Sequence, residues 1–245
     1  VTGAMVFGAV VAGLTIVATR PLRRQCDISF RPASLLTAVS RESVTAPTRT
    51  VLSHPALRSL ALSGFLLAFV QSVWFVYLTS FLAFALGYSG TEAGVLYALM
   101  QATSVAGRLL LGWAADRVRS GAPFILASLV LSTLCTLALA GLVFADRGWL
   151  PPLVCLVGGL AAAGWNGIQV SETVRLAPSE RLYEAVSGVT LAIGMGVVTG
   201  PLAVSVMLEL GLGWGVIIAS MALLPLVGVG SAYRQIVRSA AQRPE

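Results

Sequence analysis

The sequence predicts an all-α membrane protein, a polytopic bundle of seven transmembrane helices. Three observations support this fold class: 57% of the 245 residues are hydrophobic, 11% are charged, and the mean hydropathy is +0.88. A soluble domain usually carries about 25% charged residues, so this chain lacks the polar surface that a water-soluble fold of its length requires. The composition argues against a soluble enzyme and against a nucleic-acid partner, despite the net charge of +6.

Seven segments are long and apolar enough to cross a bilayer. A hydrocarbon core about 30 Å thick takes roughly 20 helical residues. Lipid offers the backbone no hydrogen-bond partner, so such segments must be helices. The predicted spans are Thr2–Ala18, Leu60–Leu86, Thr91–Ala115, Ala122–Phe144, Pro152–Val170, Ala185–Leu208 and Leu212–Ala232.

The first span is not a signal peptide, because no basic segment precedes it and no cleavage-like sequence follows it. Arg20, Arg23 and Arg24 follow it and are typical of a stop-transfer flank. The chain starts with Val and almost no sequence precedes the span. We therefore expect it to begin within a longer protein.

Arginine is distributed asymmetrically about the spans, and it is the only basic residue other than one histidine. Such a bias marks the cytoplasmic side, so we expect a multi-pass protein of the inner (plasma) membrane with its first residue outside. Only Arg147 lies on the opposite connections, and Arg108 lies within a span. The predicted cytoplasmic arginines are Arg20, Arg23, Arg24, Arg31, Arg41, Arg49, Arg58, Arg117, Arg119, Arg175, Arg181, Arg234, Arg238 and Arg243.

The segment from Arg20 to Pro55 is the one long polar stretch between spans. It is rich in Arg, Ser, Thr and Pro and shows no sustained apolar periodicity, which is typical of a linker. Short connections join the six spans that follow it. The sequence therefore predicts a single helix, a cytoplasmic linker and one antiparallel six-helix bundle.

Two motifs carry a resemblance to a known family. Gly107–Arg117 reads GRLLLGWAADR, and its Gly-x-x-x-Asp-Arg portion resembles the cytoplasmic loop between helices eight and nine of the major facilitator superfamily. Gly164–Pro178 is similar to helix ten and its exit loop in bacterial cyanate-permease-like carriers. The family loop usually continues x-Gly-Arg, whereas Val118, Arg119 and Ser120 follow here, with Gly121 displaced.

The resemblance implies the C-terminal portion of a carrier, helices six to twelve. Residues 1–19 would be the last helix of the N-terminal half, 20–56 the linker, 57–233 the C-terminal six-helix half and 234–245 a cytoplasmic tail. The implied function is secondary active transport of a small organic solute by alternating access. Its partners would be the lipid bilayer, the solute, and the missing N-terminal half or a protein supplying it.

Arg108 is the only formal charge deep in an apolar stretch. It lies eight residues before Asp116, about 12 Å along a helix, and a central arginine costs about 2.5–3.5 kcal/mol on insertion scales. Tyr97, Gln101, Ser104 and Arg108 recur at intervals of four, three and four and share a face. We hypothesise that this face lines an aqueous cavity and that Arg108 attracts an anionic solute. The alternative is that Arg108 ties helix ends together at a cytoplasmic gate.

In the family, helices seven and ten line the solute cavity, so the resemblance implies further cavity residues on the corresponding spans. The resemblance favours Gln71 and Trp74 on the second span, and it favours Trp165, Asn166 and Gln169 on the fifth. Packing or interfacial anchoring is the alternative for the two tryptophans. The amides need hydrogen-bond partners across helices or in a cavity.

The resemblance also implies a cytoplasmic gate of ion pairs among Asp116, Arg117, Glu172 and Arg175, with Gly112 as part of the loop motif. Simple anchoring by the positive-inside rule is the alternative for several of these charges. The sixth span carries small residues and a proline that favour close packing or a hinge: Gly194, Gly196, Gly200 and Pro201.

No enzymatic site is expected. There is one histidine, no phosphate loop and no cluster of metal ligands, so we predict no catalytic residue, no metal and no cofactor. Two other readings stay open. One is a heptahelical receptor; the other is a non-functional fragment that does not transport alone. No acidic residue lies deep in a span, so the coupling ion and the solute stay undetermined.

Overall fold

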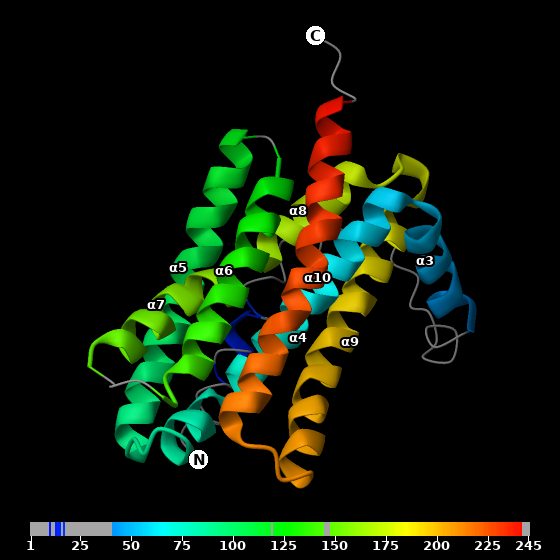
Figure 1. Cartoon of the computed structure of the whole chain (residues 1–245). Helices are drawn as coiled ribbons and strands as arrows, with labels where there is room; N and C mark the ends of the chain where they lie inside the picture. The colour runs from blue at the N-terminus through cyan, green and yellow to red at the C-terminus, as the bar shows by residue number, and fades with distance from the viewer. Residues whose placement is uncertain are drawn as a thin grey trace. The chain divides into compact units, whose positions relative to one another are not determined.

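A computed structural model describes residues 10, 13–15, 17, 41–118, 120–144 and 148–241 (Figure 1). The chain divides into two compact units, residues 1–43 and 44–245. The predicted first span, Thr2–Ala18, and most of the predicted linker fall largely outside the described residues. The described part of the second unit is entirely helical and contains no strand, which confirms the predicted fold class for that unit.

Six helical segments of the described chain are long and apolar enough to cross a membrane. They correspond to the second through seventh predicted spans, with ends within a few residues in most cases. They are α4 (Pro55–Phe84), α5 (Gly90–Val118), α6 (Ala122–Gly141), the pair α7 (Leu150–Ala163) and α8 (Asn166–Leu176), α9 (Leu182–Glu209) and α10 (Trp214–Ala241).

Helix α4 is the centre of the bundle. It touches every one of the other spans, and 67% of its most apolar 18-residue window is buried. Its apolar composition is compatible with neighbours on all sides, and its contacts with the five other spans place it at the centre. Leu67, Val70, Trp74 and Phe81 are each at most 2% exposed.

Glycines bring α9 against α4. A Cβ on Gly196 would lie 2.3 Å from the Phe65 carbonyl oxygen, and one on Gly200 would lie 2.5 Å from the Phe69 carbonyl oxygen. Both positions therefore pack backbone against backbone, as small residues allow between membrane helices. Gly194 has open space on its free side.

Pro201 lies in the interior of α9, next to this glycine contact. The Tyr77 hydroxyl of α4 donates to the Pro201 carbonyl oxygen at 3.3 Å and lies 2.8 Å from the Ser205 hydroxyl. A polar contact thus fastens the two helices just beyond the proline. Of the four positions predicted for hinge or packing, Gly194 alone lies on a face that α4 does not cover.

The fifth predicted span corresponds to one candidate membrane span that contains two α-helices, α7 and α8. The helix breaks between Ala163 and Asn166, where a Cβ on Gly164 would lie 2.9 Å from the Leu111 side chain. A Cβ on Gly159 would lie 2.3 Å from the Met100 carbonyl oxygen. The sequence did not predict these close approaches to α5, because apolar length does not indicate how closely a neighbouring backbone lies.

The polar segment before α4 ends in a helix that the sequence did not indicate, α3 (Arg41–Ser53). Pro47 lies inside it, which costs a helix interior about 3 kcal/mol. Contacts with α9 offset this cost. The Thr50 hydroxyl donates to the Glu184 carboxylate, and Gly188 leaves room for the Pro47 carbonyl and the Val51 side chain.

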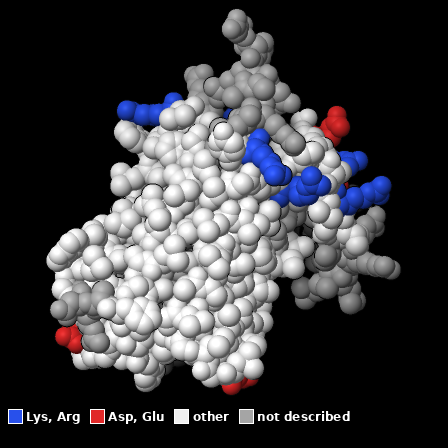
Figure 2. Space-filling model, in the orientation of Figure 1, with Lys and Arg blue, Asp and Glu red and all other residues white. Residues whose placement is uncertain are grey.

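Charged side chains gather at the ends of the bundle. On the surface shown, the arginines gather at one end, acidic side chains lie at both ends, and a wall without charged side chains separates the two ends (Figure 2). Antiparallel helices explain the pattern, since the start of α4, the ends of α5 and α8, and the start of α9 all meet at one end. Arg58, Arg117, Arg175 and Arg181 lie there.

We predict that Gly196→Ala destabilises the bundle by about 1–3 kcal/mol, because the added methyl group overlaps the α4 backbone. Gly194→Ala is the matched control. It should be neutral or stabilising by up to about 1 kcal/mol, since alanine is the better helix former and the site is open. Apparent melting temperatures of the full chain in detergent measure both effects. Equal shifts in the two variants would contradict the α4–α9 contact.

Candidate functional site

Three amide side chains lie on α4 and α8, near the break between α7 and α8. The Asn166 amide donates to the Gln71 side-chain oxygen at 3.5 Å. The Gln169 amide donates to the Leu60 carbonyl oxygen at 2.6 Å. Gln169 is fully buried, and Gly64 leaves space for its amide group. The structure thus brings together Gln71 and Asn166 from two separate predicted spans, whereas Gln169 contacts α4 nearer its start.

Two of the amide oxygens in the bundle lack a partner. The Gln169 Oε1 and the Gln101 Oε1 are buried without a hydrogen bond to any described residue. An unsatisfied buried acceptor costs about 1–3 kcal/mol, so a water molecule or a polar solute group that reached either oxygen would be favourably bound. The Ser132 hydroxyl of α6 is also buried without a partner among the described residues, so unpartnered oxygens occur on α5, α6 and α8.

The predicted polar face of α5 spans several environments. Tyr97 and Gln101 are half-buried, and Arg108 is exposed. Ser104 is 2% exposed, and its hydroxyl donates to the Gln101 carbonyl oxygen of its own helix at 2.9 Å. The face therefore borders the buried seam with α7 along part of its length and opens outward at Arg108.

Both tryptophans predicted as solute contacts lie in the core. The Trp74 indole donates to the Thr136 hydroxyl of α6 at 3.0 Å, and its ring fills the space above Gly158 of α7. Trp165 is fully buried and packs with Leu60, Leu67 and Ile168. These contacts are those of packing residues, the alternative reading of both positions.

Thr136 and Gly158 were not predicted to matter. Thr136 lies in a run of small hydroxyl residues on α6, with Ser132 and Thr133, and its hydroxyl also contacts the Ser132 carbonyl oxygen at 2.7 Å. A cluster of Ser and Thr inside an apolar span was the available signal, because membrane helices use such hydroxyls to contact one another.

Glu172 is the centre of the polar cluster at the Arg-rich end. It is 2% exposed; its carboxylate accepts a hydrogen bond from the backbone N–H of Gly121 at 2.9 Å and another from Arg175 Nε at 3.0 Å. A second Arg175 nitrogen forms a salt bridge with the same carboxylate. The cluster joins α8 to the loop between α5 and α6.

The other predicted gate residues lie differently. The guanidinium of Arg117 stacks on the Trp113 ring, 4.0 Å from its centroid. Asp116 is exposed, and Gly112 is half-buried beside open space. Of the predicted gate residues, the structure therefore joins Glu172 and Arg175 directly. It adds Gly121, where a Cβ would lie 2.6 Å from the Ile168 side chain.

The family model of the Major Facilitator Superfamily matches residues 1–181. That range is well over half of the chain. The chain belongs to the Major Facilitator Superfamily. The match confirms the superfamily resemblance and excludes the receptor reading. It also agrees with the prediction that the chain is not an enzyme, since the superfamily consists of transporters. No curated protein matches the chain.

The displaced glycine of this major facilitator protein has a structural role in its loop. The family pattern has a glycine after Asp-Arg-x, whereas here Gly121 comes five residues after Asp116. Its missing side chain lets the loop backbone approach α8 closely enough to donate to Glu172. The loop is thus held by a backbone hydrogen bond to a buried carboxylate.

We predict that Glu172→Ala destabilises this facilitator by about 1–3 kcal/mol, because the buried N–H of Gly121 loses its acceptor. Glu172→Gln keeps an acceptor oxygen and should have a smaller effect. The exposed Glu180 provides the control, and Glu180→Ala should change stability by no more than about 0.5 kcal/mol. Thermal unfolding in detergent is the measurement. A Glu172→Ala variant as stable as the control would show that the cluster does not hold the loop.

Proposed function

We propose that this chain is a secondary active transporter that moves a small anionic organic solute by alternating access, with α4, α5 and α8 forming one wall of the solute cavity. The observation that carries the proposal is a set of polar side chains on these three helices of an otherwise apolar bundle. Gln71, Gln101 and Asn166 are half-buried, as groups that meet both a core and a cavity would be.

Arg108 supports the choice of an anionic solute. It is exposed on α5, and seven residues separate it from Asp116 at the end of the helix. A charge at this depth is costly in hydrocarbon, and such residues typically face a bundle interior or a water-filled cavity. Side chains tilt toward the N-terminal end of a helix, so Arg108 leans away from the Arg-rich end and toward mid-membrane.

A second set of helices would complete the cavity. Of the six spans, α5 and α9 are the least covered, with 22% and 17% of their most apolar windows buried. The uncovered face of α9 carries Ser187, Thr190 and Gly194 along an open hollow whose other lining side chains are mostly apolar. Its small side chains would let another helix pack closely. We assign this face to a missing N-terminal half or to a partner that supplies it.

The position of the bundle within the superfamily fold follows from its motifs. Gly107–Arg117 resembles the loop between helices eight and nine, and Gly164–Pro178 resembles helix ten of cyanate-permease-like carriers. We therefore assign α4 to α10 to the C-terminal half. The arginine bias supports a plasma-membrane orientation with the linker and the C-terminus in the cytoplasm.

The cluster around Glu172 supplies a means to bias the transport cycle. An ion pair with an exposed partner contributes only about 0–1 kcal/mol, and the Arg175 side chain is 41% exposed. The hydrogen bond from the Gly121 N–H is buried and is the stronger restraint. Together these contacts favour one conformation of the α5–α6 loop without locking it.

We expect Arg108→Gln to weaken anion binding about tenfold or more, because the charge that attracts the solute is gone; each tenfold corresponds to about 1.4 kcal/mol. Binding is measured on the full chain in detergent, by thermal shift, against a panel of small organic anions, cyanate and neutral analogues of matched size.

Arg181→Gln serves as the control, since Arg181 is exposed at the Arg-rich end and lies outside the proposed wall. Unchanged anion affinity in Arg108→Gln would contradict the role of Arg108. Equal binding of neutral analogues and anions would contradict the anionic solute while leaving the membership in a transporter family intact.

A further inference from the structure

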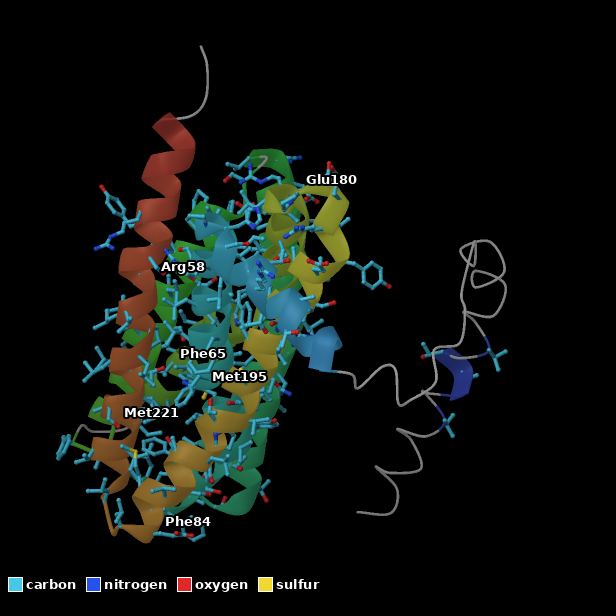
Figure 3. All side chains as sticks on the ribbon, turned by 90° about the vertical axis from the view of Figure 1, so that its right-hand side faces the viewer. Arg58, Phe65, Phe84, Glu180, Met195 and Met221 are labelled. Carbon is cyan, nitrogen blue, oxygen red and sulfur yellow. The ribbon has the colours of Figure 1, made fainter. Side chains whose placement is uncertain are left out.

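A groove of about 280 Å³ lies between α3, α4 and α9 on the side of the bundle. Its α4 wall includes Arg58, Leu62 and Phe65, which are spaced along one helical face, and its α9 wall includes Leu191 and Met195. Figure 3 shows Arg58 above Phe65 and Met195 on this side of the molecule. The groove is therefore apolar along its length and basic at its end nearest the start of α4.

A second basic side chain lies beside the groove. Arg49 borders an adjoining open hollow on α3, and the two hollows share Thr48 and Leu52. Arg49 and Arg58 are both exposed. Among the described residues, no carboxylate lines either hollow, and the nearby Glu184 carboxylate accepts a hydrogen bond from Thr50.

We propose that this groove binds an anionic phospholipid, with its phosphate between Arg49 and Arg58 and an acyl chain along Phe65 and Met195. Guanidinium groups suit phosphate because they donate in a planar fork. Basic pockets beside membrane helices bind anionic head groups. Charge complementarity at one end and an apolar wall at the other match the two parts of a lipid.

The shape of the site favours lipid over a soluble anion. Arg58, Leu62 and Phe65 span seven residues of α4, about 10 Å of helix, and this whole length presents apolar side chains beyond the arginine. A soluble anion would use only the basic end. The site also bridges α3 to the bundle, so a bound lipid would add to the contacts of Thr50 and Val51 in holding α3 on α9.

Native mass spectrometry of the full chain tests this proposal after release from nanodiscs of phosphatidylcholine that contain a minor fraction of phosphatidylglycerol. We expect the protein to retain phosphatidylglycerol in preference to phosphatidylcholine. In the double variant Arg49→Gln/Arg58→Gln, this preference should fall about tenfold or more. The charge-matched control is Arg181→Gln/Arg234→Gln, which removes two exposed arginines outside the groove and should keep the preference.

A variant that fills the groove tests the contribution of the apolar wall separately from that of the two arginines. Leu191→Trp leaves the charge unchanged and should also lower retention of phosphatidylglycerol. Equal preference in the wild type and the arginine double variant would overturn the proposal, as would an equal loss in the control. Displacement of bound phosphatidylglycerol by glycerol phosphate as effectively as by free phosphatidylglycerol would also overturn it, because that result would indicate a site for soluble anions. None of these readouts depends on solute binding, so failure here is distinct from failure of the proposed transport function.

Discussion

A bilayer interior offers no hydrogen-bond partner, and this constraint determines most of what the structure contains. Backbone groups are satisfied within helices, and hydroxyl side chains inside the spans return their hydrogen bonds to nearby carbonyls, as Thr133 does to Leu129 and Thr173 to Gln169. The Trp74 indole finds Thr136 across a helix boundary. Against this background, the buried side-chain oxygens of Gln101, Ser132 and Gln169 are exceptions, since none has a hydrogen-bond partner among the described residues. Gln101 and Gln169 lie on helices to which we assign the solute cavity, whereas Ser132 lies on α6.

Close backbone contact is the second organising feature. Glycines on α9 fit against α4, and glycines on α7 fit against α5, so the bundle contains two closely packed helix pairs. This arrangement leaves α5 and α9 largely uncovered. We propose that the uncovered faces of α5 and α9 meet a second helix bundle. A carrier that rocks two bundles about a central site requires such faces.

The sequence predicted the positions of the spans well, but it predicted poorly which side chains and helices pack against one another. Apolar length and the arginine bias are properties of single segments, which is why five of the six described spans were located as continuous helices. The close approach of α5 to Gly164 is a contact between segments, as are the contacts of α3, in which Thr50 reaches Glu184 and Gly188 leaves room for Pro47. The resemblance favoured Trp74 as a cavity residue, and it lies in the core of the bundle, since hydropathy does not indicate which side of a helix a neighbour covers. At Gly121 the sequence showed only a departure from the family motif and did not indicate the hydrogen bond to Glu172.

The central claim is that these helices cross a membrane and that their polar residues meet water within it. Labelling of single cysteines by a membrane-impermeant maleimide tests it, in a background without Cys26, Cys135 and Cys155. Cysteines at Ser179 and Gly213, on opposite ends of α9, should react from opposite sides. A cysteine at Gln101 should react faster than one at the exposed, apolar Leu134 of α6. Reaction of both end positions from one side, or equal rates at Gln101 and Leu134, would contradict the account.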